Sequence, residues 1–421
     1  MEPYTLHLGN CHDVLDTLEE NSVDSIVTDT PYEINFMAKS WDNAGVAFNP
    51  VTWEKALRVL KPGGHMLVFG HSRKMHRITV AIEDAGFEIR DTLMWIYGSG
   101  FPKSHDISKA IDKKLGAERG MIGTKRGVRG ADGTGHENAM PGKGTGIKQA
   151  QIDVDITTPA TPQAKQYDGW GTALKPAYEP IVLARKPFKG SVAENVLEHG
   201  TGGINIDECR VGFGTETDSR VGTKAKNEST HGFWQENIGE GVQMYKGNGR
   251  FPANVMHDGS EESTKDMWDW ETDSDASRYF YCAKASKKDR DEGLFKDFET
   301  VNDGRKKDID NAYQRGLTPR KNTHPTVKPT ELMQYLVRLI TPKGGTVLDP
   351  FMGSGSTGKA TMIENQERNA DYKFVGIDLT EEYIDIAKAR IEYGLNYFQN
   401  KEKEAQKVSD QQTSIFDFES E

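Results

Sequence analysis

The stretch that decides the fold reads DPFMGSGSTG and occupies residues 349–358. It follows a short apolar strand predicted at 346–348, and its three glycines fit the pattern G-x-G-x-x-G. Such glycines let the backbone approach a cofactor closely, while the start of the following helix favours an anionic group. Asp378, which ends the next predicted strand, can accept hydrogen bonds from the hydroxyl groups of a ribose. The pattern therefore predicts a cofactor site in a Rossmann-like sheet.

The late position of this loop helps to decide between two cofactors. NAD-dependent dehydrogenases have the same fingerprint, but only residues 379–421 follow Asp378, too few for the rest of a dinucleotide domain in ordinary order. The other strands must then come from earlier in the chain. Apolar runs predict strands at 22–28, 65–69, 87–95, 180–184 and 373–377, and helical periodicity predicts helices at 52–60, 73–85, 330–340 and 380–393. We therefore expect an α/β fold, a circularly permuted Rossmann-like domain, with S-adenosylmethionine ahead of NAD as its cofactor.

A second motif, DTPY at residues 29–32, follows the strand predicted at 22–28 and so lies at the sheet edge where ligands bind. The exocyclic amino nitrogen of a base is a poor nucleophile, because its lone pair is delocalised into the ring. The Asp29 carboxylate and the Thr30 carbonyl can each accept one amino hydrogen and so direct the lone pair at a methyl donor. Pro31 holds the turn, and Tyr32 offers a ring on which an extruded base can stack. The motif therefore predicts methyl transfer to a base amino group.

Composition narrows the class of protein further. A chain of 421 residues can form one core domain with a substantial insertion. It has no run of the roughly 20 apolar residues that a membrane span needs, and its start lacks a secretory signal, so we expect a cytosolic protein with no membrane partner. The three cysteines form no CxxC pair and none follows a proline. This spacing argues against a zinc site and against covalent attack on carbon 5 of cytosine.

The formal net charge of −11 is unusual for a protein that binds nucleic acid, because affinity for phosphates comes from Lys and Arg. The basic residues, however, concentrate in two stretches, 103–129 and 284–321. Two interpretations stay open for each stretch: a surface that contacts DNA, and an ordinary solvated face.

Together the motifs resemble those of the amino-methyltransferases of DNA, in their β class, where the catalytic motif precedes the target-recognition region and the cofactor loop comes last. DTPY is similar to the family's Asp-Pro-Pro-Tyr motif, DPFMGSG at 349–355 to its cofactor motif, and HPTVKP at 324–329 to the segment before that motif. Thr30 replaces the usual first proline, which keeps the carbonyl but loosens the turn. Asn10 stands where the family commonly has an aspartate near the cofactor adenine. The resemblance implies the catalytic residues Asp29, Thr30, Pro31 and Tyr32, and the cofactor-binding residues Asn10, Thr326, Lys328, Asp349, Phe351, Gly353, Gly355 and Asp378.

The resemblance also implies a function: site-specific transfer of a methyl group from S-adenosylmethionine to adenine N6 in double-stranded DNA, after base flipping. The family's aspartate form goes with adenine N6 and its serine form with cytosine N4. Transfer to cytosine N4 or to an RNA base, an NAD-dependent oxidoreductase, and a DNA-binding protein without catalytic activity are the alternatives. A homodimer and a partner nuclease, as in restriction-modification, stay open.

The domain order follows from the same resemblance together with composition, since residues 116–170 are rich in Gly, Thr, Lys and Gln. We expect a catalytic half of the core at 1–98, a mobile insertion at 99–177, a core strand at 178–186, a target-recognition region at 187–321, a cofactor-binding half at 322–398 and a flexible tail at 399–421. Within the tail, Gln412, Ile415 and Phe416 resemble the short peptide by which bacterial replication proteins dock on the sliding clamp. The alternative is a disordered end whose apolar residues fold back onto the core.

Overall fold

The computed structural model describes residues 2–34, 44–98, 104–129, 135–136, 151–211, 250–260, 280–295, 298–300 and 321–406. Contacts between residues divide the chain into two units. Unit 1 comprises Met1–Gly98, Tyr178–Phe295 and His324–Glu421, and unit 2 comprises Ser99–Ala177 and Lys296–Thr323. The region that we expected to be separate, 187–321, is therefore divided between the two units.

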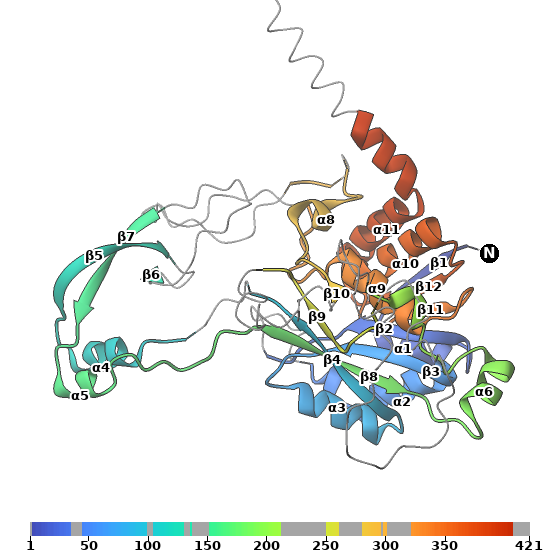
Figure 1. The fold of residues 1–421 in the computed structure, drawn as a ribbon, viewed down its shortest axis with the longest axis horizontal. Helices are drawn as coiled ribbons and strands as arrows, with labels where there is room; N and C mark the ends of the chain where they lie inside the picture. The colour runs from blue at the N-terminus through green and yellow to red at the C-terminus, as the bar shows by residue number, and fades with distance from the viewer. Residues whose placement is uncertain are drawn as a thin grey trace, which may run out of the picture. The chain divides into compact units, whose positions relative to one another are not determined.

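Unit 1 is built on a nine-stranded sheet in the order β1-β12-β11-β2-β3-β8-β4-β9-β10 (Figure 1). Neighbouring strands are parallel except that β8 runs antiparallel to both β3 and β4. The strands are β1 (Tyr4–Leu8), β2 (Val23–Asp29), β3 (Leu60–Phe69), β4 (Glu88–Ile96), β8 (Tyr178–Arg185), β9 (Val255–His257), β10 (Phe280–Tyr281), β11 (Thr346–Asp349) and β12 (Lys373–Asp378). The last strands in the chain, β11 and β12, pair with the first, β2 and β1. This order confirms the predicted permuted Rossmann-like fold.

Helices cover both faces of the sheet, and successive residues of the central strands pack on opposite faces. Ile26 of β2 belongs to a core cluster with Leu15, Trp53 and Ile78, whereas Val27 belongs to a cluster with Leu336 and Ala387. The first cluster includes residues of α1 (Cys11–Thr17), α2 (Pro50–Val59) and α3 (Met75–Asp84), and the second includes residues of α9 (Thr330–Ile340), α10 (Ser356–Arg368) and α11 (Glu381–Leu395). Figure 1 shows α2 and α3 on the opposite side of the sheet from α10 and α11. Because both faces are covered, the central strands β2 and β11 are buried along almost their whole length.

The remaining helices among the described residues of unit 1 are short, and none was predicted from the sequence. They are η3 (Val46–Phe48), α6 (Val192–His199), η4 (Asp207–Cys209) and α8 (Lys287–Asp291). A complete capping box starts α6: Ser191 accepts from Glu194 N, and the Glu194 carboxylate accepts from Ser191 N. None of the helices in the described ranges is both long and apolar enough to cross a membrane.

Unit 2 contains a three-stranded sheet in the order β6-β5-β7, formed by β5 (Gly120–Arg129), β6 (Gly135–His136) and β7 (Gln151–Thr158). Two helices, α4 (Ile107–Leu115) and α5 (Pro162–Gln166), accompany it. The buried Asp112 joins them, because its carboxylate accepts hydrogen bonds from Arg119 at 2.7 Å and from the Thr161 hydroxyl at 2.8 Å. The expectation of a loop across 116–170 is thus wrong for these residues. The glycine-rich composition did not indicate strands β5 and β7, which pair although they lie far apart in the sequence.

The first segment of unit 2, Ser99–Ala177, lies in the chain between two neighbouring strands of unit 1. Ile96, at the end of β4, pairs with Tyr178, at the start of β8. The chain therefore leaves the large sheet and returns to it at adjacent positions, and β8, the core strand expected at 178–186, lies beside β4.

Candidate active site

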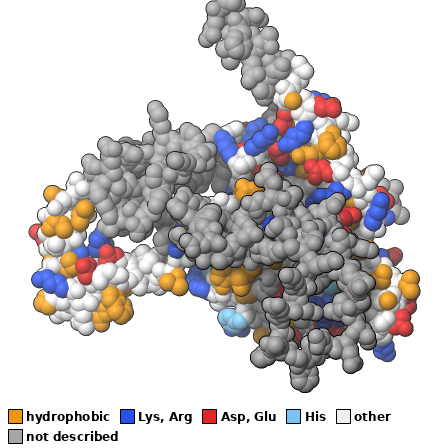
Figure 2. Space-filling model, viewed as in Figure 1, with side chains coloured by type: hydrophobic (Ala, Val, Ile, Leu, Met, Phe, Trp, Pro, Cys, Tyr) orange, Lys and Arg blue, Asp and Glu red, His pale blue; other side chains and the backbone are white. Residues whose placement is uncertain are grey.

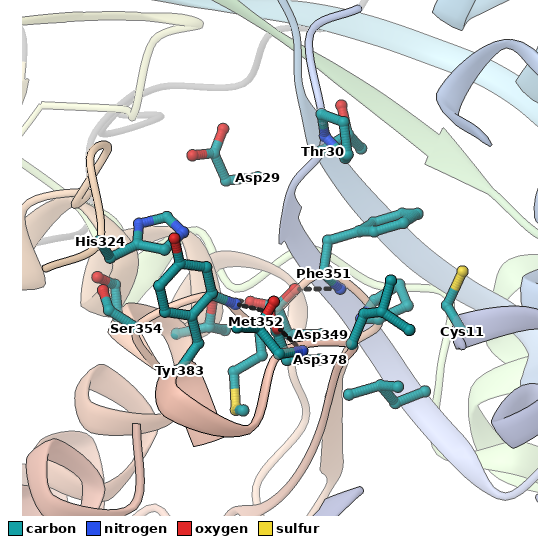
Figure 3. Close-up of a pocket in the computed structure, with 18 of the residues that line it drawn as sticks. Cys11, Asp29, Thr30, His324, Asp349, Phe351, Met352, Ser354, Asp378 and Tyr383 are labelled. Atoms are coloured by element: carbon teal, nitrogen blue, oxygen red, sulfur yellow. Dashed lines mark hydrogen bonds between the residues drawn. The ribbon is translucent and has the colours of Figure 1, made fainter. Parts of the chain in front are cut away.

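The two motifs meet at the carboxyl edge of the large sheet, because β2 ends at Asp29 and its neighbour β11 ends at Asp349. A cavity of about 190 Å³ opens there. In Figure 3, Asp29 and Thr30 lie at one end of the view, Asp349 and Asp378 at the other, and Phe351 between them. Ten of the twelve predicted site residues line the cavity: Asn10, Asp29, Thr30, Pro31, Thr326, Lys328, Asp349, Phe351, Gly353 and Asp378.

The two other predicted residues, Tyr32 and Gly355, are not part of the lining. Tyr32 contacts Lys328 through its hydroxyl, as described below. Gly355 caps α10 with a φ of 73°, and a Cβ atom at this position would lie 2.8 Å from the Cβ of Ala387. Only glycine fits both the backbone conformation and the close approach of α11. The glycine therefore shapes the loop and lets α10 start directly after it.

Asp349 fixes the start of the glycine loop through hydrogen bonds of its carboxylate. Its carboxylate accepts hydrogen bonds of 2.6 Å from the hydroxyls of Thr28 and Thr357, and a third of 3.1 Å from the backbone N–H of Phe351. Burial raises the pKa of Asp349 to about 7, although all three hydrogen bonds favour the ionised form. Since its oxygens are occupied within the protein, Asp349 acts as a positioning residue for the loop.

Asp378 holds the other side of the loop. Its carboxylate accepts hydrogen bonds from the backbone N–H groups of Gly353 at 2.9 Å and Thr380 at 2.8 Å. Burial raises its pKa, and these two hydrogen bonds oppose the rise. The carboxylate lines the cavity. Each oxygen has a second lone pair, so the group can still accept a hydrogen bond from a ligand.

Asp29 sits in a buried cluster of charged groups. Its Oδ2 lies 2.8 Å from the Nζ of Lys328, which is also 3.1 Å from Oε2 of Glu179 and donates to the Tyr32 hydroxyl at 2.9 Å. The Tyr32 hydroxyl in turn donates to Glu179 at 3.2 Å. Burial raises the pKa of Asp29, and the charge of Lys328 opposes this rise. Burial likewise acts to lower the pKa of Lys328, but attraction to Asp29 and Glu179 outweighs burial and raises it. Lys328 is therefore a cation in the free site.

Asp29 Oδ1 is buried and has no hydrogen-bond partner among the described residues. An unpaired buried acceptor costs free energy that a donor from a ligand would restore. Because Asp29 lines the cavity, its carboxylate combines one oxygen held by the protein with one available to a ligand.

Glu179 was not among the predicted site residues. It precedes the apolar run of β8 and pairs with Trp95 in the sheet register. Because β8 is antiparallel, its first residues arrive at the edge where β2 and β3 end, so Glu179 meets Asp29 there. The direction of β8 was the missing signal, since an acidic residue at the start of an antiparallel strand reaches the same edge as one at the end of a parallel strand.

Thr30, which replaces the family's first proline, gains a contact that proline cannot make. Its hydroxyl donates a hydrogen bond of 3.1 Å to the carbonyl of Phe69, at the end of β3. The side chain is buried, with 4% of its surface exposed. This hydrogen bond ties the turn to the neighbouring strand and compensates for the flexibility expected from the loss of the proline ring.

The segment at 324–329 packs against the glycine loop. His324 lies against the ring of Tyr383, with ring centroids 4.6 Å apart, and its Nδ1 is 2.7 Å from the carbonyl of Thr326. Burial lowers the pKa of His324 to about 4, so the ring is neutral at neutral pH. A Cβ atom at Gly353 would come within 2.8 Å of this ring. His324 therefore fixes the loop by packing.

The described part of the second basic stretch makes contacts within the protein. Lys288 pairs with Glu404 at 2.8 Å, Arg290 donates to the His324 carbonyl at 2.9 Å, and Lys284 lies over the Tyr97 ring at 3.4 Å. Figure 2 shows Lys and Arg side chains mixed with Asp and Glu side chains in this area, around α8. In the first stretch, Arg119 pairs with Asp112. These basic residues thus have structural partners, whatever else they bind.

Two further predictions concern other parts of the chain. The three cysteines are buried, unpaired thiols, and Cys11 lines the cavity. The proposed clamp-binding residues Gln412, Ile415 and Phe416 lie outside the described residues.

Comparison with known proteins agrees with the motifs. The Type II methyltransferase M.HindIII of Haemophilus influenzae is 22% identical over 379 residues, which cover 89% of this chain and 74% of that protein. M2.LlaDCHI of Lactococcus lactis is 31% identical over 121 residues and M.Cfr9I of Citrobacter freundii 33% over 117 residues. Each of these two matches covers 28% of this chain, and the chain spans only 42% and 33% of the two relatives.

Two solved structures are also similar. The cytosine-N4-specific PvuII DNA methyltransferase has a TM-score of 0.44 and 12% identity, with 93% of this chain and 86% of that chain covered. The complex of M1.HpyAVI with SAM has a TM-score of 0.38 and 16% identity, with 92% and 98% covered. The family model described as DNA methylase, N6_N4_Mtase, matches residues 23–389. The chain therefore belongs to the N6_N4 family of DNA methylases.

Proposed function

We propose that this protein transfers a methyl group from S-adenosylmethionine to adenine N6 at a specific site in double-stranded DNA, after flipping the base out of the helix. One observation carries the proposal: Asp29 Oδ1, a buried acceptor without a partner among the described residues, lines the same cavity as the glycine loop. A hydrogen-bond acceptor for an amino group and a cofactor loop in one cavity are what methyl transfer to that amino group requires.

The residues of the cavity fit S-adenosylmethionine. Phe351 and Ile377 offer apolar side chains for a planar base, and Asp378 can accept from a ribose hydroxyl. The start of α10 at Ser356 favours a carboxylate. The bound cofactor would supply an electrophilic methyl group on a sulfonium.

The protein's part in the reaction is to position and polarise the base amino group. In the proposed complex Asp29 Oδ1 accepts one amino hydrogen and the Thr30 carbonyl accepts the other, so that the nitrogen lone pair points at the methyl group. Lys328 keeps the Asp29 carboxylate ionised and in place. Tyr32, whose hydroxyl is held by Lys328 and Glu179, offers its ring for stacking.

The transfer is direct, without a covalent enzyme intermediate. Cys11 is the one cysteine in the cavity lining, and burial raises the pKa of its thiol to about 11. The thiolate that a nucleophile requires is therefore scarce at neutral pH. Adenine is preferred to cytosine because of the resemblance of DTPY to the aspartate form of the family motif.

The test is to incubate the protein with labelled S-adenosylmethionine and DNA and to identify the methylated base and its flanking sequence by mass spectrometry and sequencing. Asp29→Ala should abolish transfer and still bind S-adenosylmethionine. Asp385→Ala, on the exposed side of α11, is the matched control and should stay active. N4-methylcytosine as the product would overturn the choice of base. Full activity of Asp29→Ala would overturn the mechanism.

A further inference from the structure

Lys328 lies in the wrong place for a residue that only binds the cofactor. Its Nζ contacts Asp29, Glu179 and the Tyr32 hydroxyl, at 2.8, 3.1 and 2.9 Å. Asp29 lines the cavity of the proposed base site, and two of the partners belong to the DTPY turn. The side chain is buried, with 8% of its surface exposed, and still lines the cavity. Its charge is therefore held beside Asp29 at the position where a base must enter.

Adenine and cytosine share one feature next to the amino group that becomes methylated. Each has a ring nitrogen with a free lone pair beside it, N1 in adenine and N3 in cytosine. Guanine and thymine have a carbonyl oxygen and a ring N–H at the corresponding positions. In a base pair, the partner base accepts from the amino group and donates to this ring nitrogen, and flipping removes both contacts. A pocket that offers an acceptor beside a donor would replace them.

Building on the proposed function, we propose that Lys328 donates a hydrogen bond to the ring nitrogen of the flipped base while Asp29 Oδ1 accepts from the amino group. Asp29 and Lys328 then take the place of the lost partner base. Glu179 is the positioning residue, since its carboxylate pairs with the ammonium in addition to Asp29 Oδ2.

The ammonium can make this contact without losing its charged partners. An ammonium group has three hydrogens, and in the free site they point to Asp29, Glu179 and Tyr32. The hydrogen directed at Tyr32 is the one to turn to the base, because the Tyr32 hydroxyl keeps its own hydrogen bond to Glu179 at 3.2 Å. The pocket would thus accept an amino group beside a ring acceptor and reject a carbonyl beside a ring N–H, since an unpaired buried donor is costly.

Two base analogues test this contact directly. The substrate is a duplex with the recognition site found in the experiment above, in which the target is adenine, 1-deazaadenine or 7-deazaadenine. We expect wild type to methylate the 1-deaza duplex at least about tenfold more slowly than the 7-deaza duplex, because a hydrogen bond to a charged group is lost. In Lys328→Met this ratio should be at least about tenfold smaller than in wild type, while the affinity for S-adenosylmethionine stays at the wild-type value. Comparing the ratio between the two proteins cancels the intrinsic reactivity of each analogue.

A role of Lys328 that is only structural gives a different result. Lys328→Met would then slow all three duplexes equally, and wild type would not distinguish the two analogues; either outcome overturns the inference. If Lys328→Met does not fold, the double variant Glu179→Gln with Lys328→Met removes one of the two buried carboxylates, and the same ratio is expected. Failure of wild type to methylate the unmodified duplex refutes the proposed function instead. If the product is N4-methylcytosine, 3-deazacytosine replaces 1-deazaadenine, with cytosine as its reference.

Discussion

The hydroxyl of Thr28 donates a hydrogen bond of 2.6 Å to the carboxylate of Asp349. Thr28 precedes the DTPY turn, and Asp349 opens the glycine loop. The contact therefore couples the strand that ends in the proposed catalytic residues to the strand that ends in the proposed cofactor loop. Both groups are buried, at 0% and 2% exposure. The two motifs are held in register by this hydrogen bond and by the pairing of β11 with β2.

The charge of Asp349 should make folding stability depend on pH. Burial raises its pKa from 3.8 to about 7, so the folded state binds this proton more tightly than the unfolded chain. The resulting stabilisation is complete below pH about 4 and is lost as the pH rises through 7. In Asp349→Asn, where Thr357 can accept from the new amide and donate to the Val27 carbonyl, this loss should disappear. Urea unfolding at pH 4 and pH 8 should show a change smaller by up to about 4 kcal/mol than in wild type. An unchanged difference would contradict the assignment.

Lys328 should determine the pH at which the methylation rate falls on the acid side of its pH profile. Asp29 acts as a carboxylate, so the rate falls as the pH drops through its pKa. Burial raises this pKa and Lys328 opposes the rise. Without the opposing charge, Lys328→Met should lose activity at a higher pH than wild type. Single-turnover rates measured against pH check this, with Lys328→Arg as the variant that keeps the charge and the wild-type limb. A limb that stays in place in Lys328→Met would show that another group controls the rate.

The hydroxyl of Thr30 should contribute to stability. Thr30→Val keeps the shape but removes the donor to the Phe69 carbonyl, which then loses a hydrogen bond in a buried place. We expect the free energy of unfolding to fall by about 1 to 3 kcal/mol. Thr30→Ser retains the hydroxyl and should lose less. Equal stability of the valine and serine variants in urea unfolding would mean that the hydrogen bond does not hold the turn.

Substitution of Lys359 should reduce folding stability more than substitution of most other residues of α10. Its side chain is fully buried and its Nζ pairs with Asp289 at 2.9 Å and Glu292 at 2.8 Å, which joins α8 to α10. Lys359→Met leaves these carboxylates without their main partner, and we expect a loss of about 3 to 5 kcal/mol. Lys388→Met, at an exposed position of α11, is the control and should change stability by less than about 0.5 kcal/mol. A thermal melt of both variants checks the contrast.

The sequence predicted those parts of the fold that depend on local pattern. Runs of apolar and β-branched residues identified β2, the second half of β3, β4, β8, β11 and β12. β1 was missed, since its residues Tyr4–Leu8 are half-buried at the edge of the sheet. The strands of unit 2 were missed because β5 and β7 pair although the sequence between them is long and has the composition of a loop.

The candidate site was predictable where a motif marks it and unpredictable where tertiary pairing creates it. Nothing near Glu179 in the sequence indicates a site, because its position depends on the direction of β8. Lys328 belonged to a recognisable segment, but only the structure shows that it contacts Asp29. The hydrogen bond of Thr30 likewise depends on the end of β3, which lies far from it in the chain.

The pairing of Ile96 with Tyr178 has a consequence for the evolution of the chain. Neighbouring antiparallel strand ends can be joined by as few as two residues, so the large sheet does not need the intervening segment to keep its strand order. The geometry therefore lets residues 97–177 vary in length and sequence while β4 and β8 stay paired, and both motifs lie outside that segment.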